Sequence, residues 1–264
     1  MEMFDTAMPG STIRARLTRL RASGKALAFA IHLGLSLCAV GALAALMFVW
    51  WYPPPFFMVD GGWQVLRLIV LVDVVVGPLL TLIVFDRAKK ELRRDLAIIV
   101  LLQAGAFAYG TGVMVAHRPA FIVYAEKTFY SVHWRDIRRA TPDLALPESI
   151  AAGAPAPVPV VAQLPADRQE RKRLFDTMAA GGPSITHHAA LYRKLDAHNF
   201  DHIARDAVDI DELARGNPEI AAELLRVRIA HPRRKLVFVP LDCRYGLIML
   251  VFDRDTMAIV DWMS

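Results

Sequence analysis

One carboxylate lies inside a long apolar stretch of this 264-residue chain, and it is the residue with the clearest chemical potential. Asp73 interrupts the run Leu68–Val76, which otherwise holds only leucine, isoleucine and valine. An ionisable group in a bilayer is costly unless it is paired or protonated. Gly77 and Pro78 follow one helical turn later, and proline leaves a backbone carbonyl that a neighbour must satisfy. These residues predict an intramembrane interaction site.

A partner for Asp73 is predicted by depth in the membrane. At a rise of ~1.5 Å per residue, Tyr109 of a later apolar run lies at nearly the same level as Asp73. We therefore expect the Tyr109 hydroxyl to donate a hydrogen bond to Asp73. Two roles stay open: an internal bond that fixes helix packing, or a contact of Asp73 with the membrane helix of a partner. Gln103 lies nearer the cytoplasmic side and is expected to bond within the bundle.

Other reactive residues do not form a pattern typical of an active site. His198 and His202 stand one helical turn apart, but the intervening Asn199-Phe200-Asp201 lacks the glutamate of a zinc protease. An intramembrane aspartyl protease needs two membrane aspartates, one as acid and one as base, and only Asp73 lies deep in an apolar run. We expect a protein that is not an enzyme and has no cofactor or metal. Two cysteines so far apart, Cys38 and Cys243, predict no internal disulfide.

Three apolar runs must position Asp73, and each is long enough to cross a bilayer. Leu27–Val49, Val65–Phe85 and Leu96–Val115 each hold about 20 residues, which span the ~30 Å hydrocarbon core as helices. The basic start followed by Ala42-Leu43-Ala44 resembles a cleavable signal peptide, but the run continues through Val49 and favours an uncleaved helix.

Positive charge flanks these runs unequally and predicts their orientation. Five basic residues lie between Arg14 and Lys25, and the loop Asp86–Asp95 is also dense in cations, whereas Tyr52–Gln64 has no lysine or arginine. Basic loops stay in the cytoplasm. The chain is therefore expected to have a cytoplasmic N-terminus (residues 1–25), a three-helix transmembrane domain (26–115) and a periplasmic domain (116–264). The net charge of +5 is explained by this topology and does not predict nucleic acid binding.

The tail after residue 116 has the pattern of a small α+β domain. Strands are expected at Pro119–Tyr124 and Thr128–Val132, followed by a proline-rich extended connector over 141–165. Asn217-Pro218-Glu219 is a helix start signal, with Ile220, Leu224, Val227 and Leu225 on the apolar face. Further elements are expected as helices at Asp167–Ala180 and Ala189–Ala197, a strand at Lys235–Pro240, and a hairpin of Gly246–Phe252 and Met257–Trp262.

A family resemblance adds a function to this outline. The chain resembles the TfpX/TfpZ-type type IV pilin accessory proteins over roughly residues 25–135. The motifs that carry the resemblance are Trp51-Tyr52-Pro53-Pro54-Pro55, Gly61-Gly62, the segment Val72–Phe85 with its Asp73 and Gly77-Pro78, Asp95-Leu96, Gln103, Tyr109-Gly110 and Arg118-Pro119.

The resemblance implies a bacterial inner-membrane protein that acts as a chaperone-like accessory for a cognate type IV major pilin. The expected partners are the pilin and the lipid bilayer, with no nucleic acid and no small-molecule substrate. Asp73, Tyr109, Gly77 and Pro78 are the candidate partner-binding residues. The alternative is a non-catalytic subunit of a membrane enzyme that modifies or processes pilin. A sensor or a small transporter subunit fits less well, because the cytoplasmic segments are short and the helices few.

Overall fold

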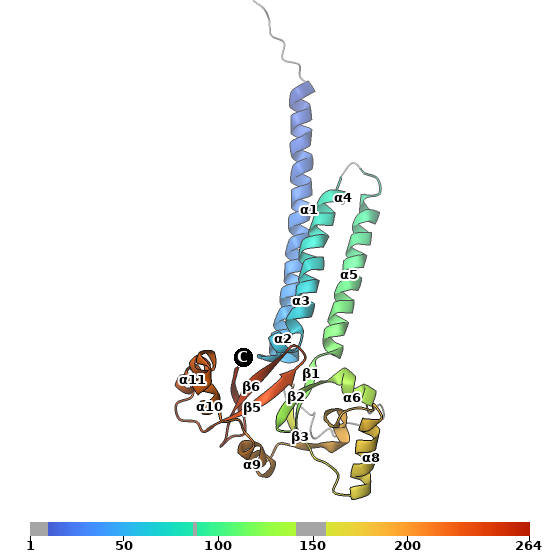
Figure 1. The fold of residues 1–264 in the computed structure, drawn as a ribbon. Helices are drawn as coiled ribbons and strands as arrows, with labels where there is room; N and C mark the ends of the chain where they lie inside the picture. The colour runs from blue at the N-terminus through green and yellow to red at the C-terminus, as the bar shows by residue number, and fades with distance from the viewer. Residues whose placement is uncertain (1–9, 87–88, 141–156) are drawn as a thin grey trace, which may run out of the picture. The chain divides into compact units, whose positions relative to one another are not determined.

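The computed structural model describes residues 10–86, 89–140 and 157–264 of the chain, shown in Figure 1. The chain forms two compact units. One contains Met1–Leu46 and Gln64–Val113, and the other contains Met47–Trp63 and Met114–Ser264. The first unit is helical, and the second is built on a sheet.

Within the described residues, three helices are long and apolar enough to cross a membrane, as the sequence predicts: Gly24–Trp51, Gly62–Val84 and Leu92–Ala116. The first consists of the part of α1 (Gly10–Leu46) from Gly24 onward and the π-helical turn η1 (Met47–Trp51). The second consists of α3 (Gly62–Val70), a π-helical segment η2 (Leu71–Val76) and α4 (Gly77–Val84). The third is α5 (Leu92–Ala116).

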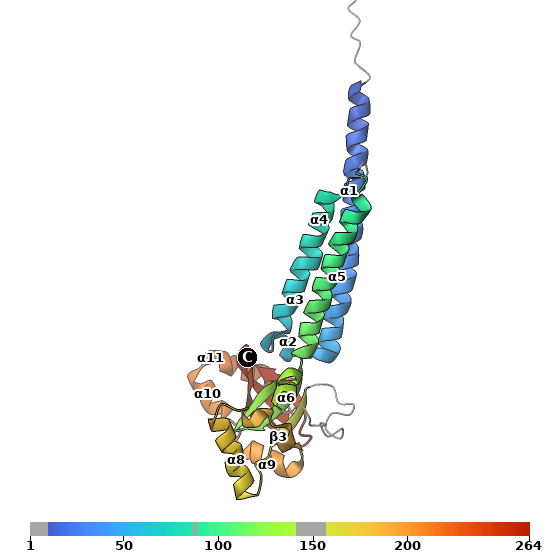
Figure 2. The same ribbon diagram turned by 90° about the vertical axis from the view of Figure 1, so that its right-hand side faces the viewer.

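The helical unit is not packed equally on all sides. Helix α1 packs closely along α4 and η2, whereas α5 makes far fewer close backbone contacts with the other helices. Figure 1 shows α1 and α4 side by side, and in Figure 2 α5 lies in front of α1. An open groove therefore remains beside α5.

The second unit is built on a mixed seven-stranded sheet with the strand order β4-β3-β1-β2-β5-β6-β7. The pairs β1–β3 and β2–β5 are parallel, and the other neighbours are antiparallel. The strands are β1 (Pro119–Ala125), β2 (Thr128–His133), β3 (Val158–Ala162), β4 (Tyr192–Lys194), β5 (Leu236–Cys243), β6 (Gly246–Asp253) and β7 (Ile259–Met263).

Alternation along the strands fills two opposite faces of this sheet. Ile122 and Val239 lie in one cluster, together with Phe200 of α9 (Ala197–Arg205). Phe121 lies in a second cluster with α6 (Trp134–Ala140), and Phe238 in a third with the paired helices α10 and α11. The remaining helical elements of this unit are α2 (Phe56–Val59), α8 (Arg168–Ala179), η3 (Ile185–His187), η4 (Ala189–Leu191), α10 (Ile210–Gly216) and α11 (Pro218–Ala230).

The loop between the first two membrane helices folds into the sheet unit, although the sequence placed it in the transmembrane domain. Phe56 lies in the main core cluster, and the Tyr245 amide donates to the Val59 carbonyl at 2.9 Å. Gly61 has φ +97°, and a Cβ there would meet the Tyr245 ring at 2.9 Å. Glycine is therefore required at this turn. The segments around Gly61 and Tyr245 are far apart in the sequence, so no local sequence pattern predicts their contact.

Local signals predicted several elements of the tail correctly. Helix α11 begins after Asn217, whose side chain accepts hydrogen bonds from the Glu219 and Ile220 amides. Strands β1 and β2, helix α8 and the hairpin of β6 and β7 also lie where they were expected. Leu225 was wrongly assigned to the apolar face of α11, since its side chain is 60% exposed.

One other prediction for the tail was wrong, and a second was incomplete, because part of the predicted extended connector is a paired strand. A helix was expected at Ala189–Ala197, but η4 and β4 occupy most of this range. The next helix, α9, begins at Ala197 because Asp196 and Asn199 form a reciprocal capping box there. Part of the 141–165 connector is strand β3, paired with both β1 and β4. Pro159 is tolerated because β4 pairs only from Val160 onward. Residues 141–156 lie outside the described ranges.

Candidate functional site

Asp73 lies in the π-helical segment η2 of the second membrane helix and is only 6% exposed. Its hydrogen-bond donor is Gln103 of α5, not Tyr109. The Gln103 Nε2 atom lies 3.4 Å from the Asp73 carbonyl oxygen and 3.5 Å from its Oδ1 atom. These are long hydrogen bonds, so the amide holds the aspartate loosely.

The π-helical geometry explains why the Asp73 carbonyl needs a donor from another helix. The Gly77 amide bonds back to the Val72 carbonyl, five residues earlier. The next residue in this pattern, Pro78, has no N–H to offer to the Asp73 carbonyl. A buried carbonyl without a donor is costly in hydrocarbon. Gln103 supplies this donor, and it therefore contacts the Asp73 backbone carbonyl as well as the Asp73 side chain.

Gly77 is required for this contact because Gln103 occupies the space next to it. A Cβ atom at Gly77 would lie 1.8 Å from Gln103 Nε2, so the Gln103 side chain would have to move away from its present position. Gly77 and Pro78 are both buried. The two residues thus act together. Pro78 leaves the Asp73 carbonyl without a backbone donor, and Gly77 leaves space for the Gln103 side chain that donates to it.

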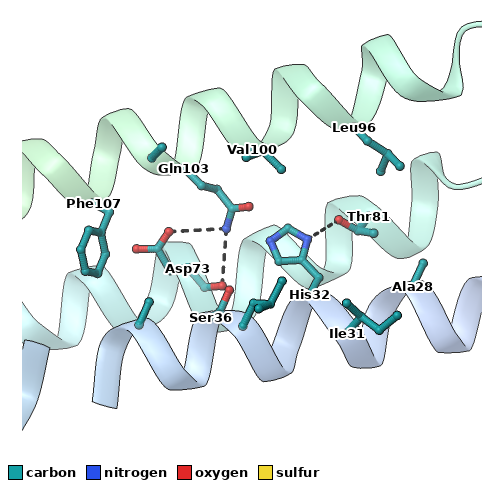
Figure 3. Close-up of a pocket in the computed structure, with 13 residues that line it drawn as sticks. Ala28, Ile31, His32, Ser36, Asp73, Thr81, Leu96, Val100, Gln103 and Phe107 are labelled. Carbon is teal, nitrogen blue, oxygen red and sulfur yellow. Dashed lines mark hydrogen bonds between the residues drawn. The ribbon is translucent and has the colours of Figure 1, made fainter. Parts of the chain in front are cut away.

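A second polar contact lies about two helical turns nearer the loop that joins the second and third membrane helices. His32 of α1 and Thr81 of α4 are joined by a hydrogen bond between Nδ1 and Oγ1 at 2.6 Å. Figure 3 shows His32 pointing toward Thr81, and Gln103 pointing toward Asp73. The two contacts form a short polar path along a surface that is otherwise apolar.

These polar groups line a groove of about 590 Å³ within the helical unit. Its apolar walls come from α1 and α5, and include Leu35, Val100 and Phe107 (Figure 3). The Asp73 Oδ2 atom is buried and has no hydrogen-bond partner in the described part of the chain. A carboxylate oxygen in this state is available to a donor that enters the groove.

The predicted bond between Tyr109 and Asp73 was wrong. The Tyr109 side chain is 77% exposed, and Asp73 bonds to Gln103 instead. Depth alone was the basis of the prediction, but direction around the helix decides contact. Tyr109 is six residues beyond Gln103, which places it about 120° away around α5 at roughly 100° per residue. The prediction that Gln103 bonds within the bundle is confirmed.

His32, Ser36 and Thr81 were not singled out as site residues. Ser36 and Thr81 are buried, and all three line the groove. The signal that could have found them is polarity at helical spacing, since His32 and Ser36 are four residues apart on α1. A scan for polar residues on one face of each membrane helix would have identified this pair.

The histidines considered as metal ligands lie elsewhere and form only a pair. The rings of His198 and His202 lie 5.2 Å apart on α9, and His202 Nδ1 accepts from the Arg205 guanidinium at 3.0 Å. Among the described residues, no group of three His, Cys, Asp or Glu side chains is placed to hold a metal ion. Both Cys38 and Cys243 are free thiols.

Comparison with known proteins identifies a family model and several relatives that the chain matches. Residues 19–61 match the family model of "Fimbrial assembly protein FimB". The fimbrial assembly protein of serogroups C1 and C2 from Dichelobacter nodosus is 38% identical over 96 residues, which cover 36% of this chain and 73% of that protein. The chain belongs to the family of fimbrial assembly proteins.

Two further fimbrial assembly proteins of Dichelobacter nodosus match over smaller shares of their length. The serogroup I protein is 38% identical over 96 residues, 36% of this chain and 37% of that protein. The serogroup E1 protein is 36% identical over 120 residues, 45% of this chain and 47% of that protein. The chain thus matches less than half the length of these two family members. No solved structure matches the chain.

Proposed function

We propose that this fimbrial assembly protein is an inner-membrane, chaperone-like accessory protein of the TfpX/TfpZ type, and that it holds a cognate type IV major pilin before assembly. Membership of the fimbrial assembly family supports a role in fimbrial assembly. The groove beside Asp73, with a carboxylate oxygen lacking a partner, is the observation that carries the binding mode.

The partner that suits this groove is a single apolar helix. Before assembly, a pilin is held in the inner membrane by one apolar N-terminal helix. The groove walls are mostly aliphatic and offer packing without charge, while Asp73 offers one acceptor at a fixed depth. In hydrocarbon, helices associate through close packing and interhelical hydrogen bonds. A polar or cationic donor on the pilin helix would therefore select this position.

An acidic residue on the pilin helix would change this pairing. Two carboxylates that share a site in a low-dielectric setting repel each other unless one is protonated, in which case the proton bridges them. In that case the proposal requires that either the Asp73 carboxyl or the acidic residue of the pilin helix is protonated. The sheet unit is proposed to lie in the periplasm, where it would meet the globular head of the same pilin.

Site-specific photocrosslinking in cells tests the proposal directly. A probe replacing Val100, which lines the groove, is expected to capture the major pilin. The matched control is a probe at Leu102, two residues along the same helix, 68% exposed and outside the groove lining. Equal capture at both positions would contradict binding in the groove.

Replacement of the carboxylate tests the role of its charge. Asp73→Asn keeps the shape and is expected to lower the pilin level and piliation at unchanged abundance of the accessory protein. Normal pilin and pili would exclude a role for the charge. If loss of the protein instead changed the mass of pilin without lowering its level, the chain would be a subunit of a pilin-modifying enzyme.

A further inference from the structure

A second cavity, of about 450 Å³, lies in the sheet unit and has a different character from the membrane groove. Its wall is rich in cationic and imidazole side chains: Arg135, Arg139, Arg244, His117, His133 and His187. Residues from β2, α6, η3 and the turn between β5 and β6 meet there, so the cavity depends on the folded unit.

Two guanidinium groups converge on one imidazole at this cavity. Arg135 Nη1 lies 2.7 Å from His117 Nε2, and Arg244 Nη1 lies 3.3 Å from His117 Nδ1. A neutral imidazole has only one acceptor nitrogen, and a protonated imidazole has none. At most one of these two contacts is therefore a complete hydrogen bond, and the arginines retain unused donors.

The carboxylates nearby are engaged elsewhere or exposed. Asp136 lies 3.4 Å from His133 Nδ1, and the buried Asp60 lies 3.3 Å from the Nε2 atom of the same ring. Asp242 lines the cavity but is exposed. Within the described ranges, none of the three arginines has a carboxylate oxygen within ion-pair distance.

The electrostatic effect of this arrangement is visible at His117. Burial, followed by the charges of Arg244 and Arg135, lowers the pKa of His117 below its ordinary value, and the opposing effect of Asp136 is smaller. Positive charge around the cavity is thus only partly balanced by its own carboxylates. An anion that enters would complete the hydrogen bonds of the arginines and relieve their repulsion.

We propose that this cavity binds a phosphate group of a phosphate ester. Guanidinium forks match tetrahedral oxyanions through paired N–H donors, and several arginines around one cavity are typical of phosphate recognition. The cavity is larger than a phosphate alone, so it also admits part of the esterified alcohol.

The position of His117 in the chain favours a lipid headgroup as the source. His117 follows Ala116, the last residue of membrane helix α5. A single peptide unit separates their Cα atoms by about 3.8 Å. This residue is therefore tied to the end of a membrane span, the level at which lipid phosphates lie. A soluble phosphate ester shares the same chemistry and is distinguished by experiment.

The test uses the full-length protein purified in detergent. Phosphatidylglycerol is added in one series and glycerol 3-phosphate in the other, and binding is followed by native mass spectrometry. We expect phosphatidylglycerol to bind, and the double variant Arg135→Gln, Arg244→Gln to weaken binding by roughly 100-fold, about one order of magnitude per arginine. The control replaces the exposed cations Arg168 and Lys172 of α8 by glutamine and is expected to bind as wild type.

Each outcome decides the proposal. Equally tight binding of glycerol 3-phosphate, lost in the double variant, supports a phosphate site and identifies a soluble ester as sufficient. Binding that both double variants weaken alike is non-specific attraction and overturns the proposal, as does the absence of binding. If the first double variant does not fold, Arg139→Gln on its own is expected to weaken binding several-fold, and unchanged binding would overturn the proposal.

Discussion

Asp60 and Asp73 are both buried aspartates close to membrane helices, but the structure treats them very differently. Asp60 accepts from the Ser131 hydroxyl and from the Arg244 amide, and its Oδ1 atom lies 3.3 Å from the His133 ring. Asp73 receives only long contacts from one amide side chain, and its Oδ2 atom has no partner among the described residues. A buried carboxylate with several hydrogen-bond partners indicates a structural role, whereas an unsatisfied one needs a separate explanation, for which we proposed partner binding.

The surroundings of the two residues differ for the same physical reason. Asp60 lies in a loop packed on the sheet core, where Ser131 of β2 and the Arg244 amide, in the turn between β5 and β6, supply its donors. Asp73 faces a groove in a helical unit that shows many of its large apolar side chains to the outside. In water this exposure would be unfavourable, but in a bilayer it costs little. A bilayer therefore permits an apolar groove in the helical unit, and under the proposed function a partner helix fills it.

The largest effect is expected from removal of the satisfied aspartate. Asp60→Ala leaves the Ser131 hydroxyl and the Arg244 amide without their acceptor, removes the carboxylate beside the His133 ring, and should lower the free energy of unfolding of the sheet unit by about 3 kcal/mol. Hydrogen exchange of the β5–β6 amides in the full-length protein would measure it. Asp176→Ala on the exposed surface of α8 is the matched control. A loss no larger than that of the control would contradict the structural role.

A smaller effect is expected where Gln103 contacts the second helix. Gly77→Ala places a methyl group on the Gln103 amide and should destabilise the helical unit by about 1–3 kcal/mol. The measurement is the thermal unfolding midpoint in detergent.

Two companion variants make that result specific. Gly105→Ala on α5, where no atom lies within 4 Å of the new Cβ, should have no such effect. Combination of Gly77→Ala with Gln103→Ala should cost less than the sum of the two single changes, because they affect one contact. Strict additivity would show that Gly77 matters for another reason.

The smallest effect on stability is expected at the unsatisfied aspartate itself. Asp73→Leu should change the free energy of unfolding by no more than about 1 kcal/mol, because Gln103 still bonds to the backbone carbonyl. Tyr109→Phe serves as the reference, and should change stability by less than about 0.5 kcal/mol since this side chain is exposed. If Asp73→Leu destabilised the protein as strongly as Asp60→Ala, the contrast between the two aspartates would be lost.

The candidate site was predicted in part from the sequence. Asp73, Gly77 and Pro78 were singled out because a charge and a proline inside an apolar run are local anomalies, and the structure places all three around one contact. Tyr109 was assigned by depth and lies on a different face of α5. The pairing of His32 with Thr81 was missed because the two residues are 49 positions apart in the chain, and polarity on one helix does not identify its partner on another.

The sequence by itself determined the three membrane helices, the cap at Asn217 and the final hairpin, because apolar length, capping and turn chemistry act over a few neighbouring residues. Only the tertiary structure decided that the loop with Phe56 and Asp60 joins the sheet unit, that Gln103 is the partner of Asp73, and that Arg135 and Arg244 converge on His117. Those contacts depend on the rotation of each helix and the register of each strand. These quantities are set by packing of the whole unit and not by any segment alone.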